Sequence, residues 1–490
     1  MTDPATGMPT RSTLSQRLLN TSYLALHYRG QAKYPYKSLE QILADQSRRV
    51  QRTVEYACRH VPYYRETMQR LGLTPLDFRT ANDLAKLPLL ERGELQRDPE
   101  YFVSTAEPLT HYLQTRSSGT MGRPCTFFYD WRSLCLDAGH TGRAGAVIER
   151  VLGRSLGYRK TMILHPRGTA SLQQEFYRDR LCLPGRLAIE RQELSLLDPL
   201  QVNVPLINAF KPDVIHSFGS YLAALFEYVR SSGQAFHRPR LLLYTFDALP
   251  ESARQMIADS FGVPAFSIYE AVEAHNIGFE CEKHVGFHLN VDLCPLRIVD
   301  ADGRNLPDGH SGNVVISNLV NRGTVLLNYR LGDIATRVSE HCPCGRVLPL
   351  LSHPEGRQDD WLERPSGQPV HPQAVVRIFK HVAHVWQWQV VQEAECRFRV
   401  LLVPAETCDR QQTQERIASE LIRVFGQQAS VNVCFVDSIP RTAGGKVRSV
   451  ISMRAHAARE LPSTTSAAST RGQANDRLSS TQLVGGGDAR

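Results

Sequence analysis

The sequence predicts an α/β protein with a large N-terminal domain of layered α/β subdomains and a small mobile α+β C-terminal domain. Between about residues 100 and 320, short apolar runs alternate with amphipathic stretches, as in layered α/β proteins. Near residues 297–316 the pattern changes to that of a β-hairpin. Strand-like and helical stretches then form a separate group over residues 361–461.

Individual elements of the large domain follow from their periodicity. Apolar residues at mostly helical spacing predict one long amphipathic helix over residues 39–61, ended by Pro62, and residues 87–98 read as a loop entering a short helix. The short apolar runs at 162–164, 214–215 and 241–244 predict buried strands, with helices over 220–230 and 250–261. Residues 297–299 and 313–316 flank an Asp-Gly turn at 302–303.

The C-terminal group contains two strand-like runs, a helix and a third strand. Residues 385–391 and 398–403 are strand-like, Ile417, Leu421, Val424 and Phe425 form a helical stripe closed by Gly426, and residues 431–435 alternate as a strand. We therefore expect an N-terminal arm over 1–38, a large domain over 39–358, a small domain over 361–461 and a disordered Ser/Thr/Gly/Gln-rich tail over 462–490.

Composition excludes several classes of protein. The chain has 490 residues, 42% hydrophobic and 22% charged, and no apolar stretch approaches the roughly 20 residues that span a bilayer. Eleven cysteines and a polar N-terminus without a secretion signal favour the cytoplasm. The net charge of +8 is spread along the chain, which argues against nucleic-acid binding. Both a monomer and a homodimer are compatible with the sequence.

Residues 116–124 read Arg-Ser-Ser-Gly-Thr-Met-Gly-Arg-Pro and are the most informative stretch. Glycines allow close approach of the backbone to an anion, and hydroxyls and amides donate hydrogen bonds to phosphate oxygens. The Gly-Lys-Ser/Thr ending of a Walker A loop is missing. A polar surface turn is the alternative interpretation.

Four further stretches carry candidate chemistry. They are Ser-Ile-Tyr-Glu-Ala-Val-Glu at 267–273, Asn-Tyr-Arg-Leu-Gly-Asp at 328–333, Gly-Arg-Gln-Asp-Asp at 356–360, and Ile-Pro-Arg-Thr-Ala-Gly-Gly-Lys-Val-Arg at 439–448. Each alone could be an ordinary turn. Their order along the chain, together with the 116–124 loop, points to a nucleotide-binding enzyme.

This order of motifs resembles the adenylate-forming superfamily of acyl-CoA synthetases, and within it the phenylacetate–CoA ligase branch with its capsule-biosynthesis-like relatives. The resemblance runs from about Leu39 to Ser452. It is also carried by His-Val-Pro-Tyr-Tyr at 60–64, Leu-Pro-Leu-Leu at 87–90 and the Glu-Cys…Gly-Phe-His stretch over 280–288.

The resemblance implies ATP-dependent activation of a small carboxylic acid to an acyl-adenylate, followed by transfer to the thiol of CoA. Mg²⁺ would be the metal partner of ATP. The β- and γ-phosphates would lie against Ser117, Ser118, Gly119, Thr120, Gly122 and Arg123. Tyr269 would face the adenine or ribose, Glu273 would hold Mg²⁺, Asp333 would accept from the ribose, and Arg357 would reach the nucleotide. Lys446 would lie between the carboxylate and the α-phosphate, and the small domain would rotate at Asp359 or Asp360.

Several positions depart from the family pattern. Glu270 replaces a glycine, Val272 replaces a hydroxyl that faces the α-phosphate, and Met121 replaces a threonine. Glu270 would disfavour a simple aryl acid or would bind an amine on the substrate. The expected acid pocket comprises His216, Phe218, Tyr221, Tyr244, Phe246 and Glu270, although an aromatic cluster at these spacings is equally typical of plain core.

A candidate structural zinc site is formed by Cys281, His288, Cys342 and Cys344. Three thiolates and an imidazole suit tetrahedral Zn²⁺. The alternative is a set of ordinary buried cysteines near a turn, and His284 and His341 are spare candidate ligands.

Two other functions remain open from the sequence. One is adenylation followed by transfer to an amine, an alcohol or a carrier protein acting in trans. The other is a non-catalytic nucleotide-binding scaffold, which Glu270 and Val272 would allow and the retained Lys446, Asp333 and Glu273 disfavour.

Overall fold

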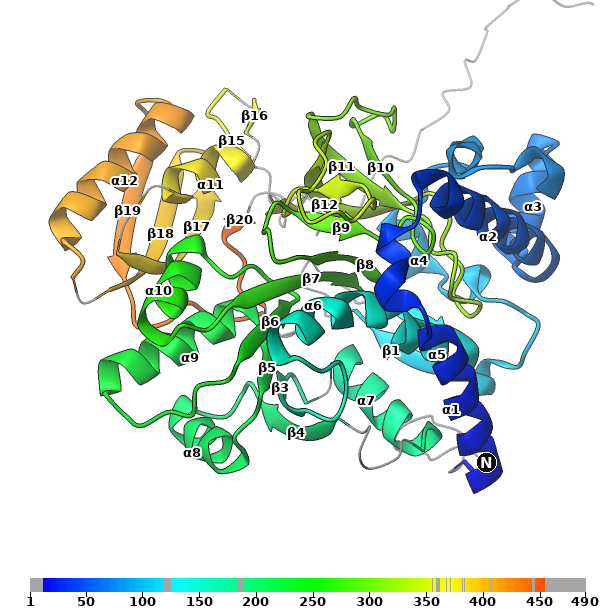
Figure 1. Ribbon diagram of the computed structural model, residues 1–490. Coiled ribbons are helices and arrows are strands. Elements are labelled where there is room, and N and C mark those ends of the chain that lie inside the picture. Colours follow the sequence, from blue (N-terminus) through cyan, green and yellow to red (C-terminus); the bar gives the residue numbers. More distant parts are fainter. Residues whose placement is uncertain are drawn as a thin grey trace, which may run out of the picture.

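A computed structural model of the protein describes residues 12–117, 125–166, 168–182, 189–354, 356–357, 362–366, 368–370, 372–380, 382, 384–405, 407–442 and 446–453. The predicted α/β fold class is confirmed: helices cover both faces of a large mixed sheet, and a smaller α+β unit lies beside it (Figure 1). The tail predicted to be disordered lies outside the described residues.

The large sheet has twelve strands in the order β10-β11-β12-β13-β9-β8-β7-β6-β5-β3-β4, with β14 paired to β12. Pairing is parallel from β4 to β7 and antiparallel from β7 to β10. The strands are β3 Arg159–Leu164, β4 Glu190–Ser195, β5 Val214–Phe218, β6 Leu241–Thr245, β7 Ala265–Ala271, β8 His275–Glu280, β9 Phe287–Leu289, β10 Leu296–Val299, β11 Ser311–Ile316, β12 Tyr329–Val338, β13 Leu350–Leu351 and β14 Gly356–Arg357.

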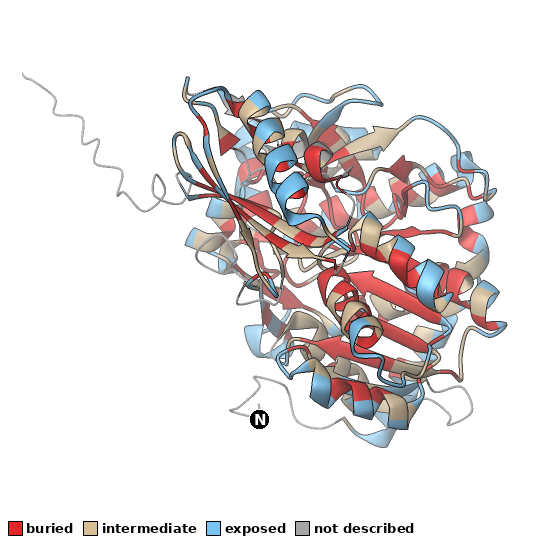
Figure 2. Ribbon diagram, turned by 90° about the vertical axis from the view of Figure 1, so that its left-hand side faces the viewer, coloured by how far each residue is buried: buried red, intermediate tan, exposed pale blue. Residues whose placement is uncertain are grey.

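Helices pack on the two faces of the parallel half. One core joins α6 and α7 to Val214, Leu241 and Leu243, and a second joins α8, α9 and α10 to Ile215 and Leu242. Alternate residues of β5 and β6 thus enter different layers, as the period of a strand requires. Figure 2 shows the buried strands in red between helices whose outer surfaces are exposed.

The helices of the large part agree with the sequence predictions where these were made. They are α1 Leu14–Tyr28, α2 Leu39–His60, α3 Pro62–Leu71, α4 Arg92–Arg97, α5 Trp131–His140, α6 Gly142–Leu152, α7 Thr169–Arg180, α8 Leu200–Phe210, α9 Gly219–Ser232 and α10 Glu251–Phe261. Short 3-10 helices are η1 Gln31–Tyr36, η2 Pro75–Asp77, η3 Ala81–Lys86, η4 Glu100–Phe102 and η5 Leu109–His111.

The N-terminal segments differ in detail from expectation. Helix α1 lies within the segment expected to be an N-terminal arm. It begins with a capping box between Thr13 and Gln16, and it packs on α5. The predicted long helix is α2, but Leu39 and Leu43 are exposed at its start rather than buried. Pro62 both ends α2 and begins α3, because proline lacks the N–H group that the first helical position does not need.

The predicted hairpin region is confirmed as the antiparallel pair β10 and β11. A separate hairpin of β1 Leu113–Arg116 and β2 Thr126–Tyr129 flanks the glycine-rich loop and was not predicted as strands.

The C-terminal unit is a four-stranded sheet in the order β19-β18-β17-β20 with two helices. Its elements are β15 Leu362–Glu363, β16 Pro369–Val370, α11 Pro372–Lys380, β17 Val385–Ala394, β18 Arg397–Pro404, α12 Arg410–Phe425, β19 Ser430–Phe435 and β20 Val450–Ser452. The unit has its own apolar core, and it lies beside α9 and α10 (Figure 1).

Among the helices that the structure describes, none has both the length and the hydrophobicity needed to cross a membrane.

Candidate active site

The base of the glycine-rich loop is held by hydrogen bonds from its two flanks. The Ser117 amide donates to the Cys125 carbonyl at 2.9 Å, and the Cys125 amide donates to Ser117 Oγ at 3.0 Å. A basic side chain is also present, because Arg92 Nη2 donates to Ser117 Oγ at 3.1 Å. The other residues predicted to hold phosphate lie outside the described residues; they are Ser118, Gly119, Thr120, Gly122 and Arg123, with Met121 between them.

Three of the predicted nucleotide-binding motifs meet at one place. The Tyr269 hydroxyl at the end of β7 donates to Asp333 Oδ2 at 2.7 Å. The backbone of Asp333 in β12 lies opposite that of Arg357 in β14. The predicted hinge residues Asp359 and Asp360 follow directly and lie outside the described residues. The chain therefore brings an aromatic ring, a carboxylate and the strand before the hinge together from distant parts of the sequence.

Glu273 follows strand β7 and lies near the base of the glycine-rich loop, where its charge influences Cys125. It is 9% exposed, and its carbonyl accepts from Asn318 Nδ2 at 3.0 Å. The Tyr129 hydroxyl of β2 donates to the Val272 carbonyl. Burial, and next the charge of Glu273, raise the pKa of the Tyr129 phenol well above its ordinary value. The Glu273 carboxylate is therefore close enough to the β2 side of the loop to influence it electrostatically.

The segment that carries Lys446 contacts the large domain directly. The Val447 amide donates to Asp247 Oδ2 at 3.3 Å, and Arg441 Nη1 donates to Ser220 Oγ at 2.6 Å. Within the segment, the Thr442 amide donates to the Lys446 carbonyl at 2.8 Å. Asp247 follows β6, which neighbours β5 and β7. Lys446 thus lies one residue from an anchor at the carboxyl ends of the parallel strands, where α/β folds usually bind ligands.

The turn after β6 is strained. Phe246 has φ +74°, and the Asp247 amide donates to the Thr245 carbonyl at 2.9 Å, which is the geometry of a classic γ-turn. Such a conformation costs a non-glycine residue about 1–3 kcal/mol and is concentrated at functional sites. It aims the Asp247 side chain at the start of α9.

The six residues predicted to line the acid pocket lie in two layers. Tyr221, Tyr244 and Phe218 are buried in the core beneath α9 and α10, where Phe246 also packs on Phe218 with ring centroids 4.6 Å apart. His216 follows Val214 by two residues and so lies on the opposite sheet face, toward α6 and α7. After burial, the charge of Lys160 is the next cause that lowers the pKa of His216. The charge of Glu270 acts on Lys160 in turn, where it opposes the lowering of the pKa by burial.

Lys160 is a polar residue of this layer that the sequence analysis did not assign to the pocket. Burial raises the pKa of Glu270 to about 7 and lowers the pKa of Lys160 to about 7. Among the residues that the structure describes, neither side chain has an ion-pair or hydrogen-bond partner within the usual distances. His216 is 7% exposed, and its Nδ1 atom has no hydrogen-bond partner there either. The signal available in the sequence was a lysine near the start of a strand whose second half, residues 162–164, is apolar.

The four predicted metal ligands converge. Their ligand atoms all lie within 4.8 Å of one another, with Cys281 Sγ to Cys342 Sγ at 3.6 Å and Cys344 Sγ to His288 Nε2 at 3.3 Å. Tetrahedral zinc with Zn–S of about 2.3 Å and Zn–N of about 2.0 Å requires separations of about 3.8 Å and 3.5 Å. Backbone amides of Lys283 and Arg346 donate to two of the sulfur atoms, which favours thiolates. The spare candidate His284 is not part of this cluster, because its Nδ1 atom lies 3.0 Å from Glu280 Oε1.

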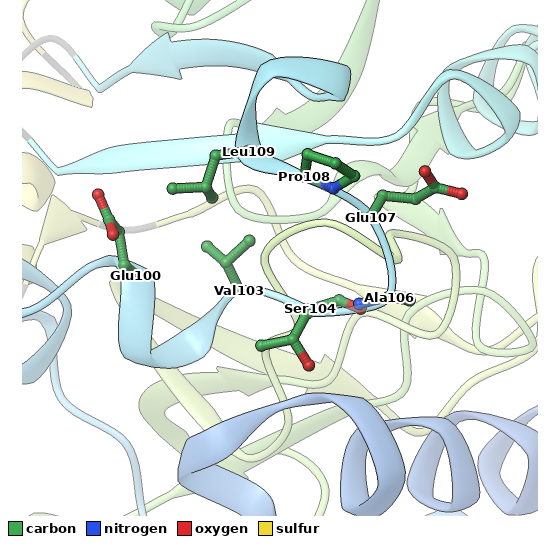
Figure 3. Close-up of a pocket in the computed structure, with 8 residues that line it drawn as sticks. Glu100, Val103, Ser104, Ala106, Glu107, Pro108 and Leu109 are labelled. Atoms are coloured by element: carbon green, nitrogen blue, oxygen red, sulfur yellow. The ribbon is translucent and has the colours of Figure 1, made fainter.

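A surface hollow of about 430 Å³ lies elsewhere, over residues 100 and 103–109. Figure 3 shows Val103, Pro108 and Leu109 in its middle, with Glu100 and Glu107 at its ends. Two carboxylates would repel a triphosphate, and none of the predicted site residues contributes to this hollow.

Comparison with known proteins gives consistent relationships. Residues 362–453 match the family model of the CapK C-terminal domain. The chain is 28% identical to a phenylacetate–coenzyme A ligase of Thermus thermophilus over 451 residues, covering 85% of this chain and 97% of the relative. It is 27% identical to the Escherichia coli phenylacetate–coenzyme A ligase over 337 residues, covering 66% of this chain and 73% of the relative.

Solved structures share the fold at lower identity. 2-Hydroxyisobutyryl-CoA ligase in its postadenylation state, bound to R3-HIB-AMP, has a TM-score of 0.69 at 18% identity, covering 86% of this chain and 92% of that chain. The same ligase in its thioesterification state, bound to 2-HIB-AMP and CoA, has a TM-score of 0.56 at 18% identity, covering 86% and 93%. The curated relatives and the C-terminal family model support the predicted adenylate-forming superfamily and its phenylacetate–CoA ligase branch, and the solved structures show the shared fold.

Proposed function

We propose that the protein activates a carboxylic acid with ATP to an acyl-adenylate and then transfers the acyl group to the thiol of CoA. The observation that carries this proposal is the convergence of four distant motifs at the carboxyl ends of the parallel strands. These are the base of the glycine-rich loop, Glu273, the Tyr269–Asp333 pair and the anchored Lys446 segment. The curated relatives are named as phenylacetate–CoA ligases, which supports CoA as the acceptor.

The residues fit ATP and its metal ion. Asp333, oriented by Tyr269, is an acceptor for the ribose hydroxyls. Glu273 offers a buried carboxylate near the loop that would hold the phosphates, and a carboxylate is a preferred ligand of Mg²⁺. When bound, the metal ion would neutralise charge on the triphosphate.

Lys446 would supply the remaining charge stabilisation. The carboxylate oxygen of the acid attacks the α-phosphorus, and the bond to pyrophosphate breaks. An ammonium group between the two anions lowers their repulsion as they approach. A non-catalytic scaffold has no need of a lysine held at this point by a mobile domain.

The acid itself would carry a polar substituent. Lys160, His216 and Glu270 present a cation, an imidazole and a carboxylate to one layer, and the described residues offer the two charges no close partner. A plain aryl acid would leave these groups desolvated and unpaired, which is costly. A hydroxyl or amine on the substrate would satisfy Glu270 directly.

Pyrophosphate release tests the function and the acid class together. Matched acids with and without a hydroxyl or amine are supplied with ATP, and CoA, amines or a carrier protein are then added separately. We expect pyrophosphate release that depends on the acid and is faster with the substituted acids. Of the three acceptors, only CoA should then take up the acyl group, as a thioester. No acid-dependent release from any acid would refute adenylation, whereas product formation only with an amine or carrier would refute the CoA acceptor.

We further propose that Cys281, His288, Cys342 and Cys344 hold a structural Zn²⁺. The near-tetrahedral separations and the amide donors to sulfur support this. The site would join the loop after β8 and strand β9 to the segment before β13. Such a thiolate site, and eleven unpaired cysteines, also fit the reducing cytoplasm.

Metal analysis after purification without chelator tests the zinc site. We expect about one zinc per chain in the wild type and in Cys434→Ser, a control outside the cluster, and little in Cys342→Ser. Chelator should lower the melting temperature of the wild type and not that of Cys342→Ser. Less than about half a zinc in well-folded wild type would contradict the assignment.

A further inference from the structure

An ordered polar contact joins the small domain to the large domain next to Lys446. Asp247 Oδ1 accepts from the Ser220 amide at 3.0 Å, and Asp247 Oδ2 accepts from Ser220 Oγ at 2.5 Å and from the Val447 amide at 3.3 Å. Ser220 Oγ also accepts from Arg441 Nη1 at 2.6 Å. We call these four residues, Ser220, Asp247, Arg441 and Val447, the latch.

The large-domain half of the latch is built by unusual backbone geometry. The strained turn at Phe246 directs Asp247 toward the first turn of α9, where backbone amides and the helix dipole favour an anion. Gly219 permits this approach, because a Cβ atom there would lie 2.4 Å from the Leu249 amide nitrogen. Side-chain bulk at residue 219 would push the two segments apart.

The small-domain half consists of residues on both sides of Lys446. Arg441 is held by Ser220 and lies over the Tyr221 ring, 5.8 Å from its centroid. Val447 is the next residue after Lys446 and is held by Asp247. The lysine segment is therefore fixed at both ends to one point of the large domain. A further contact, from Gln387 Nε2 to the Ser220 carbonyl at 2.8 Å, anchors β17 at the same helix end.

The latch concentrates several hydrogen bonds on one partly buried carboxylate. Asp247 carries a single carboxylate that receives three hydrogen bonds, and Arg441 lies near enough to influence its titration. Hydrogen bonds to a carboxylate are stronger than those to a neutral acceptor, and removing the charge leaves their donors with a weaker acceptor.

We propose that Asp247, Ser220 and Arg441 are positioning residues that lock Lys446 into the adenylation arrangement, and that the latch must open before thioester formation. This proposal rests on the proposed ligase function. It goes beyond that function because it assigns control of the domain arrangement to an aspartate of the large domain. The higher TM-score to the postadenylation state than to the thioesterification state of the same ligase agrees with a latched arrangement.

The half-reactions separate this role from a merely structural one. We measure the rate of adenylation by the release of pyrophosphate. In Asp247→Asn and Arg441→Gln we expect this rate to fall about tenfold or more, because Lys446 is no longer held in position for adenylation. Thioester formation from preformed acyl-adenylate and CoA should stay within about twofold of wild type or rise. Asp259→Asn, an exposed aspartate of α10, is the matched control and should leave both rates unchanged.

Hydrogen–deuterium exchange provides a readout that does not depend on activity. Peptides that contain the Ser220 and Val447 amides should exchange faster in Asp247→Asn, while peptides of β5 and β17 stay protected. Equal loss of both half-reactions, or unchanged exchange at both amides, would overturn the latch. Faster exchange in a protein that never forms an adenylate would uphold the domain contact and refute the ligase function instead.

Discussion

Removal of the Tyr269 hydroxyl tests the proposed nucleotide site at a single atom. Tyr269→Phe keeps the buried ring and deletes the 2.7 Å hydrogen bond to Asp333. A hydrogen bond to a charged group contributes about 1.5–3 kcal/mol, and Asp333 keeps its place in β12 through backbone pairing. We therefore expect about 1–2 kcal/mol of lost ATP binding, equivalent to an increase of about 5–30-fold in the KM for ATP.

The turnover number should change little, because in the proposed site Asp333 would contact the ribose equally in the ground state and the transition state. The assay is pyrophosphate release as a function of ATP concentration at saturating acid. Tyr101→Phe is the matched control, since Tyr101 donates to the Glu66 carboxylate at 2.5 Å on the surface. A KM within about twofold of wild type, in a variant that melts normally, would refute the assigned role of Asp333.

Three other predictions follow from the same structure. Lys446→Ala should lower adenylate formation by about 10²–10³-fold with the KM for ATP within about threefold of wild type, measured by pyrophosphate release; equal rates would exclude the lysine from catalysis. Burial raises the pKa of Glu270 to about 7 in the folded protein, above the ordinary carboxyl value that applies in the unfolded chain. The stability contributed by neutral Glu270 is therefore full at pH values below the ordinary carboxyl pKa, and it is lost as the pH rises to about 7. The melting temperature of wild type relative to Glu270→Gln should therefore fall between pH 5 and pH 7, and a constant difference would contradict the burial of this carboxyl group. Arg143→Met breaks a buried bidentate pair with Asp292 and should lower the free energy of unfolding by about 3–5 kcal/mol in denaturant titration. Arg159→Met removes a partly exposed pair with Glu190 and should cost at most about 1 kcal/mol, so similar losses in the two variants would be inconsistent with this difference.

Local periodicity was sufficient to predict the fold class and many elements. The strands β3, β5 and β6 and the helices α2, α9, α10 and α12 all follow from apolar spacing that the structure reproduces. The exposed Leu39 and Leu43 show the limit of this reasoning, because the α2 stripe is buried only where other elements cover it. Helix α11 and strands β1 and β2 are too short for their spacing to stand out.

Site residues were predicted from motif order, and their partners were not. No local pattern indicates that Tyr269 reaches Asp333 64 positions later, or that Asp247 receives the Val447 amide from the small domain. The Phe246 turn was likewise hidden, because a bulky residue gives no sequence signal for positive φ. The candidate zinc ligands were predicted from residue type and spacing, while their convergence depends on the antiparallel pairing of β9 and β13.

The most direct test of the account is acid-dependent exchange of labelled pyrophosphate into ATP by the wild type and Lys446→Ala, across acids with and without a polar substituent. The account predicts exchange in the wild type that favours hydroxyl- or amine-bearing acids and is nearly lost in the variant. Absence of acid-dependent exchange in the wild type, or undiminished exchange in Lys446→Ala, would contradict it.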